Sequence, residues 1–149
     1  MPVTIRPAHP RDLAEVHAMI GQLARHHGDE PRIALAQLQQ QIFTDQRARV
    51  LVAAGAGVLA GYALILPRPN LVTGGAGWDI NHLFVRKPLR GQGIGRALIA
   101  AVTALARAEG AEILLIGTHA TNLGAQAAYL AMGLPQLPAP GPRFQVALD

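Results

Sequence analysis

Two apolar strand patterns on either side of one long amphipathic helix constrain the fold of this chain most. Residues 78–85 and 113–116 have strand character, and residues 93–110 carry Leu98, Val102 and Leu105 along one helical face. A strand–helix–strand crossover returns the chain in its original direction, so these two strands should pair in parallel. The fully apolar second strand, Ile113–Ile116, further suggests burial on both faces.

The remaining patterns predict antiparallel strands and three more helices. We expect strands at Val3–Arg6, Arg49–Ala54, Val58–Pro67 and Arg143–Leu148, and helices over Leu13–His26, Leu35–Ile42 and Asn122–Met132. The chain therefore has the pattern of an α/β (α+β) fold, with a mixed, mostly antiparallel central sheet flanked by helices in the order β-α-α-β-β-β-α-β-α-β. The length of 149 residues fits a single domain, 1–149.

Composition excludes several classes of function. The chain has no cysteine, so thiolate metal sites, disulfides and a cysteine nucleophile are excluded. Residues 50–66 carry no charge, but three glycines interrupt them and they fit two buried strands better than a membrane span. The first twelve residues lack the apolar segment of a secretory signal, so we expect a cytoplasmic protein.

A glycine-rich segment between a strand and a helix is the strongest local signal. Residues 90–95 read Arg-Gly-Gln-Gly-Ile-Gly, where unpaired N–H groups and the helix dipole would attract an anion. Arg86, Lys87, Arg90 and Arg96 add positive charge around it. A P-loop would need Lys and Ser or Thr after the last glycine, and the dinucleotide fingerprint needs its third glycine one residue later. Both fit worse than a different phosphate-binding loop.

At this point the sequence resembles the GCN5-related N-acetyltransferase (GNAT) superfamily. Residues 90–95 match the acetyl-coenzyme A loop Gln/Arg-x-x-Gly-x-Gly/Ala, which follows a strand that ends here in Leu83-Phe84-Val85. Residues 122–133 match a second motif through Asn122, Ala125, Tyr129 and Gly133, and Ile5-Arg6-Pro7-Ala8 ahead of Asp12 resembles the usual opening. The resemblance covers nearly the whole chain.

The resemblance implies acetyl-CoA as a co-substrate. The N–H groups of residues 92–96 would hold its pyrophosphate, and its pantetheine arm would lie along residues 83–85 where that strand parts from residues 113–116. The implied cofactor-binding residues are Leu83, Phe84, Val85, Arg90, Gly91, Gln92, Gly93, Ile94, Gly95, Arg96, Asn122 and Tyr129.

The implied catalytic groups surround the thioester. A backbone N–H near Val85 would stabilise the oxyanion, and Tyr129 matches the position of the general acid. Polyamine-acetylating relatives carry a glutamate where this chain has Asn81, which cannot accept a proton. Asp79, His82 and ordered water therefore remain candidates for the base; Asp79 is favoured because strand alternation turns His82 to the other face unless a bulge intervenes.

We therefore expect an acetyl-CoA-dependent N-acetyltransferase that acts directly on the amine of a small molecule, such as an amino acid, a diamine or an aminoglycoside-like compound. The alternatives are a protein amine as acceptor and a non-catalytic acyl-CoA sensor of the same fold, which Asn81 keeps open. We expect no metal, because neighbouring histidines diverge on a helix. We expect no nucleic-acid partner, because the sequence offers no aromatic stacking surface and its basic residues gather at one loop. We also expect no membrane partner, and a homodimer by analogy.

Overall fold

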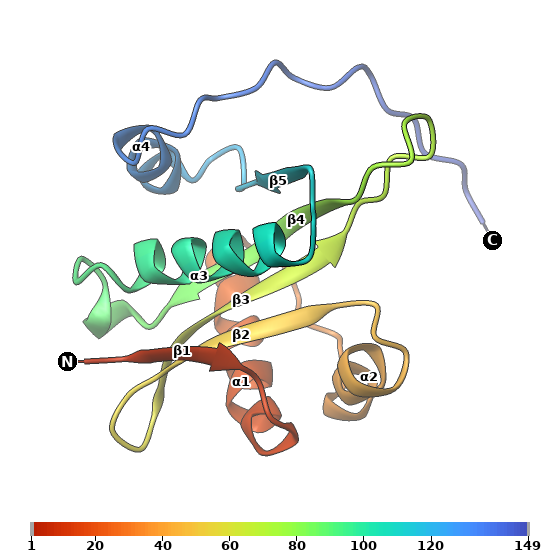
Figure 1. Cartoon of the computed structure of the whole chain (residues 1–149). Coiled ribbons are helices and arrows are strands. Elements are labelled where there is room, and N and C mark those ends of the chain that lie inside the picture. Colours follow the sequence, from red (N-terminus) through yellow and green to blue (C-terminus); the bar gives the residue numbers. More distant parts are fainter. Residues whose placement is uncertain (1, 149) are drawn as a thin grey trace. The chain divides into compact units, whose positions relative to one another are not determined.

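The computed structural model describes residues 2–148, which form two compact units that meet in sequence at His119 and Ala120 (Figure 1). The first unit contains β1 (Thr4–Pro7), α1 (Leu13–His26), α2 (Leu35–Gln39), β2 (Arg49–Ala54), β3 (Leu59–Pro67), β4 (Gly77–Val85), α3 (Ile94–Ala108) and β5 (Ile113–Ile116). The second unit contains α4 (Leu123–Ala131) followed by irregular chain.

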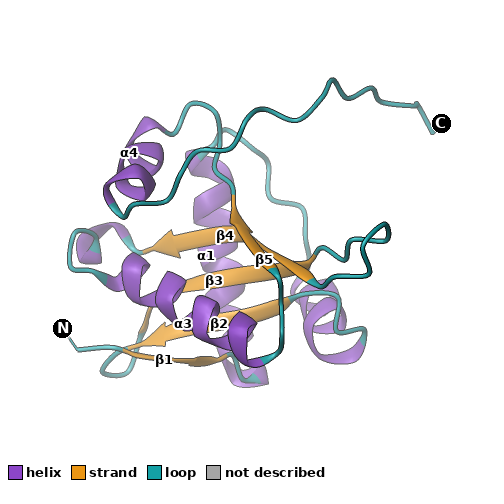
Figure 2. Cartoon of the chain, turned by 45° about the horizontal axis from the view of Figure 1, so that its top comes forward, coloured by secondary structure: helices purple, strands orange, loops and turns teal. Residues whose placement is uncertain are grey.

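The sheet of the first unit has the strand order β1-β2-β3-β4-β5 (Figure 2). The first four strands pair antiparallel with their sequence neighbours, and β5 pairs parallel to β4 through the α3 crossover. This confirms the mixed, mostly antiparallel sheet expected from the sequence. It also confirms that residues 50–66 form two strands, joined at a turn where Gly57 has a φ of 79°.

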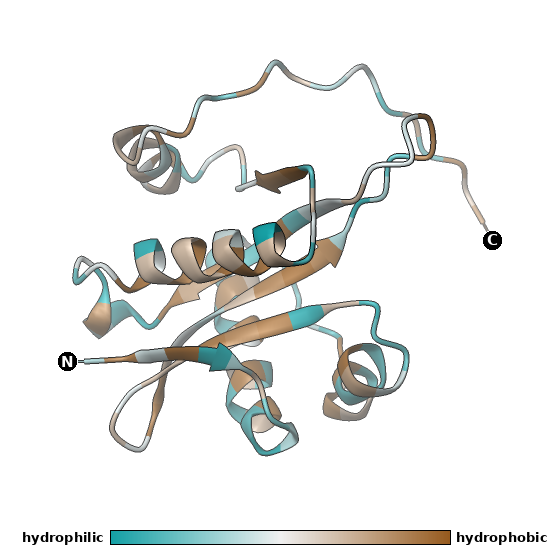
Figure 3. Ribbon diagram, in the orientation of Figure 1, coloured by the Kyte–Doolittle hydropathy of each residue, from teal (hydrophilic) through white to brown (hydrophobic). Residues whose placement is uncertain are grey.

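Two separate hydrophobic cores cover the two faces of the sheet. On one face α1 and α2 pack through Leu13, Val16 and Leu38, and on the other α3 packs through Leu98 and Val102 (Figures 1 and 2). Hydropathy colouring shows apolar residues along β2 and β3, which lie between these cores (Figure 3). Among residues 2–148, no helix has the length and apolar character needed to cross a bilayer.

The start of the chain is fixed by a buried carboxylate. Asp12 is only 7% exposed and accepts two hydrogen bonds from the Arg6 guanidinium, at 2.7 and 3.1 Å, and one from the His9 backbone N–H at 2.7 Å. Arg6 lies in β1 and Asp12 immediately precedes α1, so these bonds join the first strand to the first helix. The Arg6 guanidinium lowers the pKa of Asp12 to about 2.

The structure corrects three expectations. The second helix is α-helical only to Gln39, and residues 40–44 continue as a π-helical turn. β5 is not buried on both faces, because it is the edge strand and Ile113 is 51% exposed. Residues 143–148 form no strand: Phe144, Val146 and Leu148 are 92%, 78% and 96% exposed, and no described strand pairs with them. Alternating apolar residues form a strand only where a partner completes the ladder.

Candidate active site

A bulge in β4 sets which side chains face the candidate site. In the pairing of β3 with β4, Leu64 lies opposite His82 and the next residue, Ile65, lies opposite Ile80, so Asn81 is an extra residue on β4. Ile80 and Leu83 consequently both pack on the α3 side of the sheet. The His82 side chain therefore lies on the α1 side of the sheet, beside Tyr62. Without the bulge, strand alternation would place it on the α3 side with Ile80.

His82 lies in a partly buried group with Tyr62 of β3. The Tyr62 Oη and His82 Nδ1 atoms are 3.1 Å apart, within hydrogen-bond distance, and the two rings meet edge to face. Burial lowers the pKa of His82, and His27 lowers it further by electrostatic repulsion. His82 is therefore a neutral imidazole at pH 7.

His27 and His119 form a second imidazole pair in the same unit. Their rings stack with centroids 5.1 Å apart, and the Nε2 atom of His27 is buried without a hydrogen-bond partner among the described residues. Burial, followed by repulsion from His119, lowers the pKa of His27. The sequence alone does not predict this pair, because the approach of His27 and His119 depends on how α1 and β5 meet the sheet.

Asp79 lies on β4 on the same side of the sheet as His82. Its flanking residues, Trp78 and Ile80, pack into the α3 core, so the Asp79 side chain points to the opposite face, where it is partly exposed. The Asn81 side-chain amide donates to Asp79 Oδ2 across a long 3.4 Å contact. Both candidate bases are thus brought to one face, and Trp78 has the packing role that its burial implies.

The end of β4 has a backbone edge that β5 leaves uncovered. The pairing between β4 and β5 described by the structure covers Gly77–Ile80, so residues 81–85 extend beyond it. The Arg86 N–H donates to Ala60 O on the β3 side, and strand alternation places the N–H and C=O groups of Leu83 and Val85 on the other side. Phe84 differs from its predicted role, because its backbone faces β3 and its ring is buried in the α1 core.

The glycine-rich segment leads directly into α3. Gly91 and Gly93 have φ values of 78° and 82°, in the left-handed region, and a Cβ at either would meet nothing within 4 Å. Gly93 is the N-cap without any side-chain cap, and the first intrahelical bond runs from Ala97 N–H to Gly93 O. The N–H groups of residues 94–96 precede that bond and have no intrahelical acceptor.

Ile94 and Gly95 begin α3 beside the β4 edge; Ile94 is buried and Gly95 is partly buried. Gly95 packs against the side chains of Leu83 and Val85, at distances of 3.9–4.0 Å from the position of an added Cβ. The Ile94 side chain is buried in the α3 core, so its contribution to an anion site is limited to its backbone. The open helix terminus and the uncovered strand edge are therefore adjacent, which is the arrangement that an extended ligand ending in a phosphate requires.

Some basic residues around the glycine-rich segment are paired with other protein groups, and others are exposed without an ion-pair partner among the described residues. Arg86 donates to Leu59 O at 2.7 Å and forms an ion pair with Glu15 at 3.3 Å, so its charge is compensated. Lys87 and Arg96 are exposed and form no ion pair with the described residues. The positive potential at the helix terminus is therefore smaller than four free cations would give.

Arg90 folds back onto β4. Its Nε donates to Val85 O at 2.8 Å, and its guanidinium lies 5.6 Å from the centre of the Phe84 ring. This contact occupies the Val85 carbonyl, which lies on the strand edge where the pantetheine arm is expected. Gln92, the neighbouring predicted residue, is exposed.

Asn122 and Tyr129 belong to the second unit. The Asn122 side chain caps α4 by accepting a hydrogen bond from Ala125 N–H at 3.1 Å, a structural role that its Oδ1 atom already fulfils. Tyr129 lies within α4, and burial raises the pKa of its hydroxyl. Tyr129 therefore keeps its proton at neutral pH, as a general acid must.

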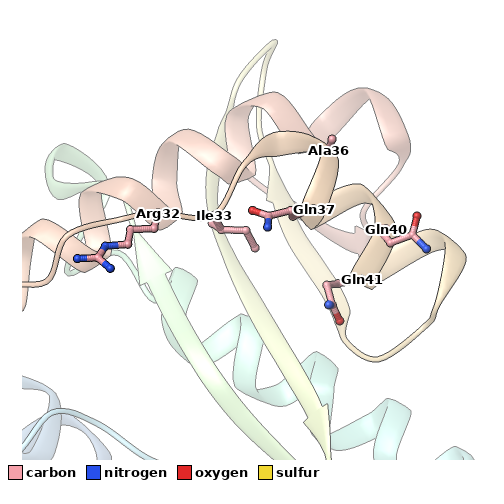
Figure 4. A pocket seen from close by; sticks show the side chains of 6 residues that line it. All are labelled: Arg32, Ile33, Ala36, Gln37, Gln40 and Gln41. Atoms are coloured by element: carbon pink, nitrogen blue, oxygen red, sulfur yellow. The ribbon is translucent and has the colours of Figure 1, made fainter. Parts of the chain in front are cut away.

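One pocket of about 570 Å³ lies elsewhere in the first unit. Figure 4 shows the amide side chains of Gln37, Gln40 and Gln41 around it, together with Arg32, Ile33 and Ala36 from α2 and the chain before it. None of the predicted site residues lines this pocket. Within residues 2–148, no group of three or more His, Asp or Glu side chains is placed to hold a metal ion.

Comparison with known proteins identifies the family of this chain. Residues 14–134 match the model of the acetyltransferase (GNAT) family. The chain is 31% identical over 136 residues to an aminoglycoside N(6')-acetyltransferase type 1 of Stenotrophomonas maltophilia, an alignment that covers 89% of this chain and 86% of that protein.

Solved structures share the fold at lower identity. A ribosomal-protein-alanine N-acetyltransferase from Brucella melitensis biovar Abortus 2308 has a TM-score of 0.78 and 22% identity, with coverage of 99% of this chain and 100% of that one. An aminoglycoside acetyltransferase from an uncultured soil metagenomic sample has a TM-score of 0.79 and 19% identity, with full coverage of both. The family match and the curated relative together show that this chain belongs to the acetyltransferase (GNAT) family.

Proposed function

We propose that this protein transfers an acetyl group from acetyl-CoA to a primary amine of a small cationic molecule of the aminoglycoside type. The observation that carries the proposal is the adjacency of the uncapped α3 terminus and the uncovered β4 edge. The first provides N–H donors for a diphosphate, and the second provides strand-like hydrogen bonds for an amide-containing arm. The 31% identical aminoglycoside N(6')-acetyltransferase supports the choice of acceptor.

The donor would be held mainly by backbone atoms. The N–H groups of residues 94–96 would bind the pyrophosphate, with Lys87 and Arg96 as supporting cations. Leu83 would hydrogen-bond to the pantetheine arm through its backbone groups at the edge of β4. The left-handed glycines would let the phosphates approach the backbone, since no Cβ stands in the way.

The acyl-transfer step needs three functions from the chain. The amine nitrogen bonds to the thioester carbonyl carbon and the carbon–sulfur bond breaks. Asp79, directly or through a water, would take the amine proton, and Tyr129 would donate a proton to the departing sulfur. The Val85 N–H would stabilise the negative charge that develops on the carbonyl oxygen. His82 is the alternative base.

Acidic groups on the first unit fit a cationic acceptor. Asp79 is on the α1 side of the sheet, and Asp29 and Glu30 are exposed in the chain that follows α1. His27 and His82 add no opposing charge at pH 7, because the pKa of each is lowered. These groups would attract an ammonium group before it loses its proton.

Calorimetry with acetyl-CoA, followed by a thiol assay for released CoA with a panel of aminoglycosides, diamines and amino acids, tests the proposal. We expect binding, turnover with at least one aminoglycoside, and a loss of kcat of about 100-fold on Tyr129→Phe. Arg96→Ala at the start of α3 should weaken acetyl-CoA binding several-fold, whereas Arg107→Ala in its last turn is the matched control and should not. Binding without turnover on any amine would instead identify an acyl-CoA sensor, and absence of binding would refute the assignment.

A further inference from the structure

The hydrogen bond between Tyr62 and His82 determines which nitrogen of His82 carries its proton. Tyr62 is fully buried in the middle of β3, and its Oη lies 3.1 Å from His82 Nδ1. A neutral imidazole has one N–H donor and one basic nitrogen, and its partner decides which is which. Two arrangements are therefore possible. If the Tyr62 hydroxyl donates to Nδ1, the proton of His82 is on Nε2; if Nδ1–H donates to the hydroxyl, Nε2 is the basic nitrogen.

Burial selects one of the two arrangements. It raises the pKa of Tyr62, so the phenol keeps its proton at any pH where the protein is studied. A buried O–H without an acceptor costs about 1–3 kcal/mol. Among the described residues, His82 Nδ1 is the hydrogen-bond partner of this hydroxyl. The Tyr62 hydroxyl therefore donates, Nδ1 accepts, and the proton of neutral His82 is on Nε2.

We propose that Tyr62 is a positioning residue that holds His82 as the Nε2–H tautomer, so that His82 acts in the acyl-transfer reaction as a hydrogen-bond donor and not as the base. This inference rests on the proposed function. The basic nitrogen of His82 is covered by the Tyr62 hydroxyl. Adding a proton there would force that hydroxyl to turn away and lose its acceptor. The amine proton consequently goes to Asp79 or to water bound by it.

The surroundings of His82 agree with this assignment. The imidazole is partly buried, and both its burial and the electrostatic influence of His27 oppose a positive charge on it. The carboxylate on the same face, Asp79, is partly exposed and can reach solvent. The two polar side chains of β4 thus have different chemistry: His82 is a neutral hydrogen-bond donor, and Asp79 is an acceptor.

Two substitutions of His82 separate a donor from a base. Glutamine places an amide N–H close to the position of Nε2–H but has no basic nitrogen, whereas leucine has neither. We expect His82→Gln to retain kcat within about tenfold of wild type and His82→Leu to lose at least about 100-fold. Equal, large losses in both folded variants would overturn the proposal. Asp79→Asn should lose activity regardless of the His82 variant.

Nitrogen NMR of the ¹⁵N-histidine-labelled full chain gives a readout that does not depend on turnover. The wild-type His82 should show a protonated Nε2 and an unprotonated Nδ1. Tyr62→Phe removes only the hydroxyl, and we expect it to shift the tautomer ratio of His82 toward Nδ1–H. Thr103→Val, which removes a hydroxyl that donates to Ile99 O in α3, is the control and should leave the ratio unchanged. A wild-type protein with Nδ1–H, or an unchanged ratio in Tyr62→Phe, would refute the inference.

The two experiments distinguish the failure of this inference from failure of the proposed function. If no amine supports CoA release, the proposed function is wrong, and the NMR spectra still decide the tautomer. If the wild type turns over but His82→Gln and His82→Leu are equally inactive, the function stands and His82 is a base. If His82→Gln does not fold, the wild-type and Tyr62→Phe spectra remain sufficient.

Discussion

At the scale of single residues, the site depends on contacts that join distant parts of the chain. Tyr62 is the single aromatic residue in the apolar strand β3, a pattern that indicates burial and nothing more. Its hydroxyl acquires a function only because the strand register brings His82 beside it. Asp79 and His82 were predicted as candidate bases from the sequence. Their placement on one face could not be predicted, since it depends on the unpaired Asn81.

Asp12 provides a prediction about acid stability. The pKa of its carboxyl is 3.8 in the unfolded reference and about 2 in the folded chain, so the folded state favours the ionised form. The resulting stabilisation, roughly 2 kcal/mol, is complete above about pH 4 and disappears as the pH falls toward 2. Urea unfolding from pH 7 to pH 2 should show this loss in the wild type and its absence in Asp12→Asn.

The exposed carboxylate Asp45 supplies the control for that experiment. It accepts one hydrogen bond, from the Gln40 side chain, at the surface. Asp45→Asn should therefore retain the pH dependence of the wild type. A difference between wild type and Asp12→Asn that stays constant from pH 7 to pH 2 would contradict the assignment.

At the scale of secondary structure, most elements could be predicted because the spacing of apolar residues within each segment indicates a helix or a strand. The ends of the strands and helices of residues 4–116 lie at most three residues from their expected positions. The prediction of a strand at residues 143–148 was wrong. A strand also needs a hydrogen-bonding neighbour, and alternating apolar residues do not indicate whether one is present. The bulge in β4 could be considered from the sequence only as an exception to strand alternation. Its presence depends on how β4 pairs with β3, which the sequence of β4 alone does not determine.

The close approach of β3 and β4 beside the site gives a prediction at this scale. A Cβ at Gly61 would collide with the backbone carbonyl oxygen of Phe84. Gly61→Ala should therefore push the strands apart and lower the free energy of unfolding by at least about 1–3 kcal/mol. Gly124→Ala, in α4, meets only ordinary contact and should stabilise by about 0.5–1 kcal/mol. Thermal unfolding of both variants would show opposite signs, and equal effects would contradict the packing.

At the scale of the whole molecule, the C-terminal residues contribute little to the described packing. Phe144, Val146 and Leu148 are each more than three-quarters exposed, so their removal deletes little buried surface. We predict that a chain ending at residue 142 melts within about 2 °C of the full chain. A fall of several degrees, accompanied by dissociation in light scattering, would instead show that these residues are buried between the subunits of the expected homodimer.

Because the β4 edge would bind the acetyl donor through main-chain groups, the proposed enzyme can acquire a different amine acceptor without losing its donor. Main-chain amides are supplied by every residue type, so replacing Leu83 or Val85 alters a side chain while leaving the same amides in place. The neighbouring face presents Asp79 and His82, whose chemistry depends on residue identity. Selection for a new amine could therefore act on one side of the strand without disturbing donor recognition on the other.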